Sequence, residues 1–261
     1  MDTVKVLQEI ELKLLKTQSE MILIPGGTFL MGSSEITHEG PQHEVTVSPF
    51  LMGRYPVTQA QWRAVASLPQ VERELDPYPS QFKRGGSEKH YYPVESISWY
   101  EAMEFCARLS AYADRTYTLP SEAQWEYACR ADTTTAFYFG ETITTDLANY
   151  DGTYNYGAST NGVFRKETTP VDSFLPNEFG LYDMHGNVSE WCLDHFHPNY
   201  DGAPNDGSAW LLKNNSYSDS YRMLRGGSWD HYSWNCRCAY RTYENPDFRL
   251  CYNGFRVVSV L

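Results

Sequence analysis

The stretch from about Ala131 to Arg222 restricts the fold of this chain more than any other feature. Apolar residues lose their helical spacing there, and Gly, Asn, Asp, Pro and Tyr are frequent. A compact domain rarely contains so long an irregular segment, because buried backbone N–H and C=O groups need partners. We therefore expect ordered loops that are held by side-chain networks or by metal ions.

Charge and length exclude several classes of protein. The chain has 261 residues and a formal net charge of −12, and this length suffices for one large domain or two smaller ones. The negative charge excludes a general binder of nucleic acid or of anionic membranes, since both need a basic surface. No apolar run reaches the length of a membrane span, and the first twenty residues lack the apolar run of a signal peptide. The expected compartment is the cytoplasm.

The cysteines are too sparse for a disulfide scaffold, and we expect them to be thiols in a reducing compartment. Cys236 and Cys238 also lack the C-x2-C spacing of a zinc site, so no zinc is expected. The full set is Cys106, Cys129, Cys192, Cys236, Cys238 and Cys251.

Residues 1–20 place Val4, Leu7, Ile10 and Leu14 at helical intervals among charged residues, which predicts an amphipathic helix. It either docks on the domain or serves as an arm that recruits a signalling or protease partner. Residues 21–32 then predict a strand, a Gly-Gly turn and a second strand. Further strands are expected at 44–48, 222–225 and 254–258.

Three predicted helices begin with the same capping box, in which a hydroxyl and a Gln or Glu side chain accept hydrogen bonds from free backbone N–H groups. A tryptophan accompanies each of them, and core packing is the expected role of these rings. The pairs are Thr58 with Gln61, Ser98 with Glu101, and Ser121 with Gln124, and the tryptophans are Trp62, Trp99 and Trp125.

Six ordered motifs carry a resemblance to a known family. They are IPGGTFLMG at 24–32, PVESISW at 93–99, LPSEAQWEY at 119–127, GLYDMHGNVSEW at 180–191, RGGSW at 225–229 and GFR at 254–256. Together they resemble the formylglycine-generating enzyme, or sulfatase-modifying-factor, family. The resemblance implies an α+β fold of the C-type-lectin-like class over residues 21–261. A single domain with a small twisted antiparallel sheet, helices and much irregular loop structure is expected.

The resemblance also implies positions for metals. Active members of the family oxidise a substrate cysteine with copper held by two cysteines, a soft ligand pair that suits Cu(I). His231 stands at the first of these positions and Cys236 at the second. Relatives also bind Ca2+ at the positions of Asp183, Gly186, Val188 and Glu190, and oxygen ligands of this kind suit that ion. A second calcium site would use Asn149 and the Tyr150 carbonyl, although no acidic ligand for it is evident.

Within the C-terminal segment 225–258, positions that look structural alternate with positions rich in Tyr, Trp, Ser, Asp and Thr, the composition of binding loops. Trp229, Arg241, Asn245, Asp247 and Phe255 are expected to be scaffold. The predicted ligand-binding set is Asp230, His231, Tyr232, Ser233, Trp234, Tyr240, Thr242, Tyr243, Glu244, Phe248, Leu250, Cys251 and Tyr252.

This interrupted pattern resembles the variable proteins of diversity-generating retroelements. In such proteins, adenines of a template are mutated, which changes asparagine codons into codons for other residues. Most of the predicted ligand-binding residues are ones that an asparagine codon can become in this way, whereas Trp234 and Glu244 are not. The sequence thus predicts a non-catalytic protein that displays a diversified surface to an unknown protein or other macromolecular ligand. The alternative is a copper-dependent formylglycine-generating oxidase that uses His231 and Cys236.

Overall fold

The structure is a computed structural model, and it describes residues 9, 12, 13, 20–82, 91–154, 156–157, 161–212 and 221–261. Val4, Leu7, Ile10 and Leu14, on which the N-terminal helix was predicted, lie outside the described residues. Residues 9, 12 and 13 are helical, and Leu12 packs against the core. No helix in the described ranges is both long and apolar enough to cross a membrane.

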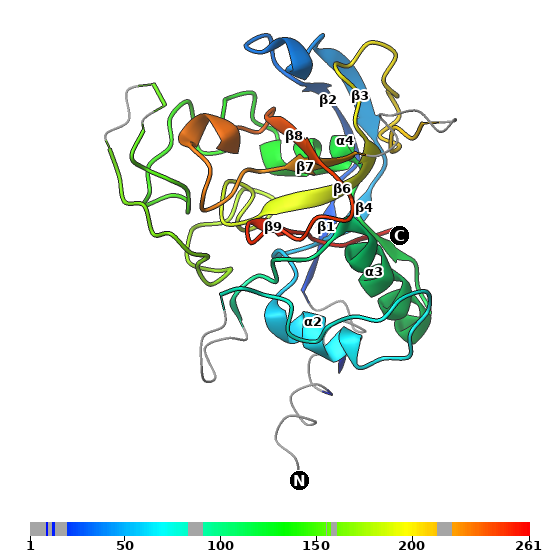
Figure 1. Cartoon of the computed structure of the whole chain (residues 1–261). Helices are drawn as coiled ribbons and strands as arrows, with labels where there is room; N and C mark the ends of the chain where they lie inside the picture. The colour runs from blue at the N-terminus through cyan, green and yellow to red at the C-terminus, as the bar shows by residue number, and fades with distance from the viewer. Residues whose placement is uncertain are drawn as a thin grey trace.

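Strands from both ends of the described chain share one antiparallel sheet in the order β1-β4-β10-β5. Their bounds are Met21–Ile24, Phe50–Gly53, Val258–Ser259 and Tyr117–Thr118. β2 (Gly27–Met31) and β3 (His43–Val47) pair only with each other among the described strands, and they arch over one end of the molecule (Figure 1).

A second four-stranded sheet, in the order β8-β7-β6-β9, carries the C-terminal segment. Its strands are β8 (Arg241–Glu244), β7 (Arg222–Arg225), β6 (Ser189–His195) and β9 (Asn253–Gly254). The β6–β9 pair is parallel, and the other pairs are antiparallel. β6 lies inside the stretch predicted to be irregular. Its first four residues are all buried, so the alternation that identifies a half-buried strand is absent.

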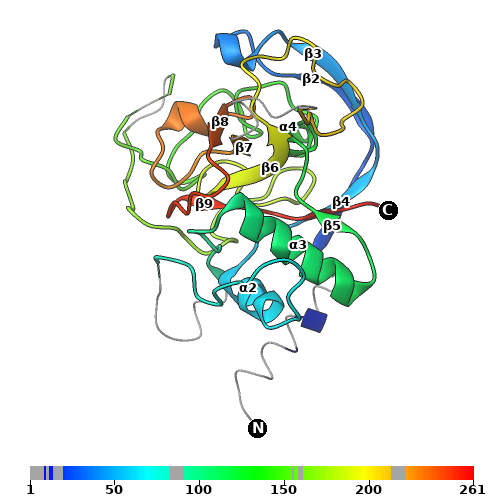
Figure 2. The ribbon, with the colours of Figure 1, turned by 45° about the vertical axis from the view of Figure 1, so that its right-hand side comes forward.

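The three predicted capping boxes are confirmed. They open α2 (Gln59–Ala66), α3 (Trp99–Ala113) and α4 (Glu122–Arg130), and in each the hydroxyl and the third helical side chain satisfy backbone N–H groups. Figure 2 shows α2 and α3 together below the sheets, while α4 lies under the β2–β3 ribbon beside β6 and β7. The accompanying tryptophans are buried, as expected. Short 3-10 turns occur at Thr37–Glu39 (η1) and Ser233–Cys236 (η4).

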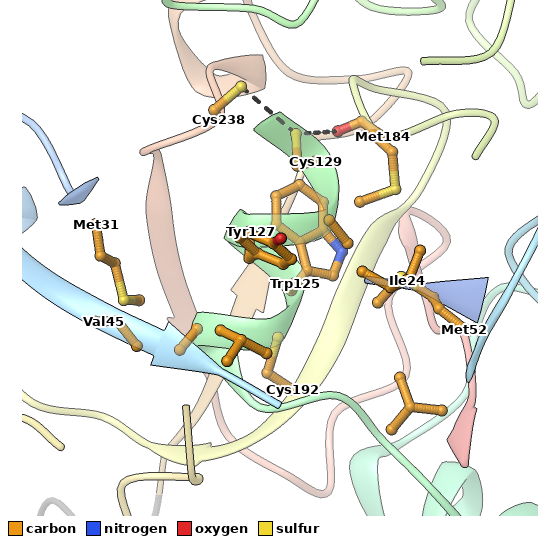
Figure 3. Packing of buried hydrophobic residues seen from close by; sticks show 14 of the residues in the cluster. Ile24, Met31, Val45, Met52, Trp125, Tyr127, Cys129, Met184, Cys192 and Cys238 are labelled. Carbon is orange, nitrogen blue, oxygen red and sulfur yellow. Dashed lines mark hydrogen bonds between the residues drawn. The ribbon is translucent and has the colours of Figure 1, made fainter. Parts of the chain in front are cut away.

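Two large apolar clusters fill the space between these elements. One is centred on Trp62, whose ring stacks on Phe105 and meets Phe255 edge-on. The other surrounds Trp125 and Tyr127 of α4 (Figure 3). Each cluster joins a helix to residues of the C-terminal segment, so that segment is part of the core as well as of the surface.

Two predictions about strands need correction. β1 and β2 exist, but Gly26 and Gly27 do not form a hairpin turn, because the two strands join different sheets. Gly26 instead allows a close approach, since a Cβ atom there would lie 2.7 Å from Cδ of Pro49. The strand expected at 254–258 is divided between β9 and β10, which also lie in different sheets.

The irregular stretch is held by side chains that bind backbone, as predicted. Asn177 donates to the Ala128 carbonyl and accepts from Leu181 N, at 2.7 and 3.0 Å. Asn187 accepts from Thr169 N at 2.9 Å and donates to its carbonyl at 3.1 Å. These bonds satisfy polar groups that would otherwise be buried without partners.

Candidate ligand surface and metal positions

Four buried arginines fix the backbone of the C-terminal segment. Each reaches a glutamate far away in the sequence, and charge-assisted pairs of this kind are both strong and geometrically specific. Arg237 binds Glu39 with N···O distances of 2.8 and 2.7 Å, and Arg241 binds Glu122 at 2.6 and 2.8 Å. The other two pairs are Arg225 with Glu126 and Arg256 with Glu190.

The predicted ligand-binding residues differ in exposure. Trp234, Tyr243 and Phe248 are the most open of the large apolar ones, at 37%, 45% and 51%. Ser233 is an exception because it is fully buried and its hydroxyl donates to the Tyr154 carbonyl at 3.2 Å. It does not belong to an exposed surface. Asp230 is exposed, and the remaining members, which are His231, Tyr232, Tyr240, Thr242, Glu244, Leu250, Cys251 and Tyr252, are partly buried.

One aromatic patch combines the C-terminal segment with a loop that the sequence reasoning missed. The ring of Tyr154 lies 4.8 Å from Tyr232 and 6.3 Å from Trp234, and the latter two are 4.8 Å apart. Tyr154 is 55% exposed. Its loop follows Asp151, whose backbone N–H donates to the His231 carbonyl at 2.8 Å. The Tyr-rich sequence of residues 150–156 was the available signal for this contribution.

A second patch surrounds Tyr243 on β8. Its ring is 4.0 Å from Phe196 and 5.3 Å from Tyr221, the residues that follow β6 and precede β7. Along β8, Arg241 is buried, Thr242 and Glu244 are partly buried, and Tyr243 is exposed. Arg241 and Tyr243 are two residues apart and therefore lie on the same face of the strand, which is covered at Arg241 and open at Tyr243.

Trp229 is the buried aromatic of the scaffold, as predicted. Its ring meets Phe82 edge-on at 5.2 Å and stacks near Phe164 at 6.2 Å, and its Nε1 donates to the Cys251 carbonyl at 3.1 Å. Arg241 and Phe255 are also buried.

The two polar scaffold residues occupy more open positions. Asn245 is partly buried, and its side chain accepts from Asp247 N at 3.0 Å, which stabilises the turn after β8. Asp247 itself is exposed.

His231, at the position where the resemblance implies a copper ligand, points into the protein. Its Nδ1 lies 3.2 Å from Oγ of Ser228 and 3.5 Å from Oγ of Ser189, and its ring is 5.5 Å from that of Tyr252. Burial lowers the pKa of His231 to about 4, so the imidazole is neutral at physiological pH. The ring is partly buried, and its Nδ1 lies within hydrogen-bonding distance of two hydroxyl groups.

Cys236 occupies a different environment. It is fully buried in a third apolar cluster with Phe137, Ile143, Ala148 and Tyr150. Burial raises the pKa of its thiol to about 12. The Cys236 sulfur contacts the Tyr232 carbonyl at 3.7 Å and shares no hydrogen bond with His231 in the described structure.

The residues at the first calcium position fit the ion in part. Asp183 is buried, its Oδ2 has no hydrogen-bond partner among the described residues, and burial raises its pKa well above the usual range. An unpaired buried carboxylate oxygen suits a bound cation. Glu190 does not fit, because Arg256 binds both of its oxygens at 2.7 Å and Trp125 Nε1 donates to Oε2. Gly186 and Val188 lie on the loop between these two side chains, and Gly186 has a φ of 80°.

At the second calcium position, Asn149 is fully buried and its Oδ1 has no partner in the described part of the chain. Its backbone pairs with Gly186, which brings the two positions side by side. Tyr150 is also buried, and its hydroxyl donates to the Ile143 carbonyl at 3.1 Å. Arg165, which donates to the Thr145 carbonyl, places a positive charge near the Tyr150 hydroxyl.

Comparison with known proteins relates this architecture to curated relatives. The chain is 33% identical over 256 residues to the serine/threonine-protein kinase pkn1 of Chlamydia caviae, covering 91% of this chain and 37% of the kinase. The chain spans about two fifths of the length of this and two further chlamydial kinases. It is 27% identical over 289 residues to the formylglycine-generating enzyme of Thermomonospora curvata, covering 92% and 93% of the two chains.

Two solved structures share the fold. PvdO from Pseudomonas aeruginosa superposes with a TM-score of 0.77 at 32% identity, covering 92% of this chain and 94% of PvdO. Treponema denticola variable protein 1 superposes with a TM-score of 0.73 at 24% identity, covering 92% and 95%. Residues 8–261 match the family described as the sulfatase-modifying factor enzyme 1-like domain. The chain therefore belongs to the formylglycine-generating, sulfatase-modifying-factor family and has its C-type-lectin-like fold.

Proposed function

We propose that this chain is a non-catalytic ligand-binding protein, and that its C-terminal segment displays the contact surface. The observation that carries the proposal is the division within that segment. Arg225, Arg237, Arg241 and Arg256 are buried in ion pairs, whereas Trp234, Tyr243 and Phe248 are exposed. Aromatic rings that gather at the surface, as those of Tyr154, Tyr232 and Trp234 do, are typical of a contact surface. Tyr and Trp also provide rigid contact area at a low entropic cost.

The position of His231 supports the absence of the family's oxidase activity. A neutral imidazole between two serine hydroxyls stands where an active relative would have a cysteine, and Cys236 is a buried thiol with a high pKa. Fold alone does not decide activity, so the side chains at the site carry this inference.

The ligand we propose is another protein, bound by a surface that varies among copies of the gene. The similarity in fold to a protein named variable protein 1 supports a scaffold of this kind. DNA sequencing around the gene tests the variation separately from the binding. We expect a reverse transcriptase gene and a near-copy of the region that encodes residues 225–258. If both are absent, the diversification proposal is wrong and only the binding proposal stands.

Site-specific photocrosslinking tests the binding surface. A benzophenone amino acid is placed at Tyr243, Phe248 or Tyr154, and at Leu23 as a matched control. Leu23 is 58% exposed but lies on β1 in the other four-stranded sheet. In extract from the source cells, we expect the same crosslinked partner from the first three positions and none from Leu23. Equal crosslinking at all four positions, or none at any, contradicts the proposal.

The alternative function, copper-dependent oxidation of a cysteine, is favoured by the similarity to the Thermomonospora curvata enzyme along nearly its whole length. The test supplies the protein with Cu(I), oxygen and a peptide with the sequence Cys-x-Pro-x-Arg. An oxidase would convert the cysteine of this peptide to an aldehyde. Mass spectrometry of the peptide measures this conversion. We expect none, whereas turnover that is lost in Cys236→Ser establishes the oxidase.

We also propose that a calcium ion binds at Asp183. The buried Oδ2 of this residue, which has no hydrogen-bond partner among the described residues, supports the proposal, because the ion would supply the contact that this oxygen lacks. Glu190 is better described as the partner of Arg256 than as a ligand. The role of the ion would be structural, because it would hold the loop that leads into β6.

A further inference from the structure

Cys129, His185 and Cys238 form a buried cluster that the ligand surface does not use. Cys129 lies in the last turn of α4, His185 in the loop before β6, and Cys238 two residues after η4. One sulfur or ring nitrogen from each lies within 4.8 Å of the others. The two Sγ atoms are 3.6 Å apart and face each other in Figure 3. Three separate segments thus bring their thiol and imidazole groups to one point in the core.

The cluster is fully enclosed. Cys129 and Cys238 are completely buried and His185 is 2% exposed. Besides Cys238, the Cys129 sulfur contacts the Met184 carbonyl at 3.7 Å, which is a weak hydrogen bond for a thiol. The guanidinium of Arg130 interacts electrostatically with both sulfur atoms. Burial nevertheless raises the pKa of the Cys129 thiol, so the charge of Arg130 offsets only part of the cost of a thiolate there.

The imidazole has a defined tautomer. Its Nδ1 lies 2.7 Å from the Cys236 carbonyl, which can only accept, so Nδ1 carries the proton and Nε2 carries the lone pair. Nε2 accepts from Tyr138 N at 3.1 Å. The ring of Tyr138 stacks on His185 at 4.8 Å. An imidazole whose N–H donates to a backbone carbonyl is held in the orientation that metal-binding histidines use.

The spacing of the sulfurs matches a shared ion. With metal–sulfur bonds of about 2.3 Å, two thiolates on one metal lie about 3.8 Å apart at the tetrahedral angle and about 4.0 Å apart at the trigonal angle of a three-coordinate ion. The observed 3.6 Å therefore needs an opening of about 0.4 Å for the proposed site. The cluster offers three soft or borderline ligands, and among the described residues no fourth His, Cys, Asp or Glu belongs to it. Structural zinc almost always takes four ligands, so this set favours Cu(I).

We propose that Cys129, Cys238 and Nε2 of His185 form a buried binding site for a single thiophilic cation, Cu(I) in preference to Zn(II). Each thiol releases its proton when it binds the ion. The ion takes the Nε2 lone pair in place of the hydrogen bond from Tyr138 N, and Tyr138 is only partly buried. An ion bound here would link α4 to the C-terminal segment, which contains the displayed aromatic residues. The proposal is independent of the binding and oxidase functions, because neither uses these three residues.

The test uses anaerobic, fully reduced protein in which Cys251→Ala removes the partly exposed thiol, because the other five cysteines are buried. Cu(I) is supplied as its coloured bicinchoninate complex, and Zn(II) is titrated separately with a zinc indicator. We expect the protein to remove one equivalent of Cu(I) and to gain thermal stability, with weaker uptake of Zn(II). X-ray absorption of the copper-loaded protein should show two sulfur neighbours and one nitrogen neighbour.

Matched variants distinguish this site from adventitious thiol binding. Cys129→Ala and Cys238→Ala should each abolish stoichiometric uptake and the copper-dependent stabilisation, and His185→Asn should remove the nitrogen neighbour. Cys106→Ala is the control, because Cys106 is equally buried but lies in another cluster, and it should bind as the parent does.

Three results would overturn the proposal. The first is that the parent takes up no Cu(I) although its thiols are shown to be reduced. The second is an unchanged stoichiometry in Cys129→Ala and Cys238→Ala. The third is an intact mass two hydrogens lower that resists reductant, with peptide mapping that joins Cys129 to Cys238, because a disulfide there excludes the metal site.

Discussion

The C-terminal segment contains a buried and an exposed set of side chains that differ in their contacts. The buried set consists of arginines that reach glutamates on α4, β6 and η1, so its geometry depends on partners distant in the sequence. The exposed set includes Tyr243 and Phe248, which are about half exposed. Because the arginines occupy different positions from the displayed rings, we expect the exposed side chains to tolerate change without loss of the fold. The proposed diversified binding surface requires this separation.

Loss of a buried arginine–glutamate pair should lower the free energy of unfolding more than any other change predicted here. Glu190→Gln leaves the Arg256 guanidinium, which is completely buried, without its charged partner. Removal of one partner of a buried pair typically destabilises by about 3 to 5 kcal/mol. Urea unfolding followed by fluorescence measures the change. The matched control is Arg249→Gln, whose pair with Glu101 is half exposed and should contribute less than about 1 kcal/mol. Similar losses in the two variants would contradict the special role of the buried pairs.

Chelation tests the loop that contains Asp183 and leads into β6. If calcium binds at Asp183, excess chelator should lower the melting temperature, because an ion bound only by the folded state stabilises it by about 2.7 kcal/mol at a hundredfold excess over its dissociation constant. Asp183→Asn should abolish this response to chelator, and calorimetry with and without added Ca2+ measures it. A melting temperature that excess chelator leaves unchanged, after prolonged dialysis, would mean that hydrogen bonds alone hold the loop.

Acid should destabilise the protein through His231. Its folded pKa of about 4 lies below the unfolded value, so the unfolded state binds the proton first. The stability that His231 contributes is complete above pH 6.5 and is lost as the pH falls from about 6.5 to 4, by about 1 to 2 kcal/mol for a partly buried ring. His231→Gln should flatten this part of the pH profile of unfolding free energy. An unchanged profile in the variant would show that another group titrates.

The sequence predicted local structure better than long-range contacts. The capping boxes at Thr58, Ser98 and Ser121 were predictable because their bonds join residues three positions apart. β6 was not, because strand pairing and burial on both faces hide its periodicity. The arginine–glutamate pairs also escaped prediction, since Glu39 and Arg237 are distant in the chain and meet only through the fold.

For the candidate site too, composition predicted which residue types are displayed but not which residues distant contacts bury. Composition identified Trp234, Tyr243 and Phe248 as displayed rings, and all three are exposed. It did not separate Ser233 from them, because burial of a small polar residue depends on the neighbouring Tyr154 loop. Likewise, the pairing of Cys129 with Cys238 follows from how α4 packs and has no signature in their spacing.

A paired stability scan tests most directly whether the displayed rings are separable from the scaffold. Trp234→Ala, Tyr243→Ala and Phe248→Ala are compared with Trp229→Ala, which removes an aromatic that is 8% exposed and packed against Phe82. Truncation of the displayed rings should cost within about 1 kcal/mol of unfolding free energy, and loss of Trp229 about 3 to 5 kcal/mol. If the three displayed variants unfold as readily as Trp229→Ala, those rings are core and the protein has no separable binding surface.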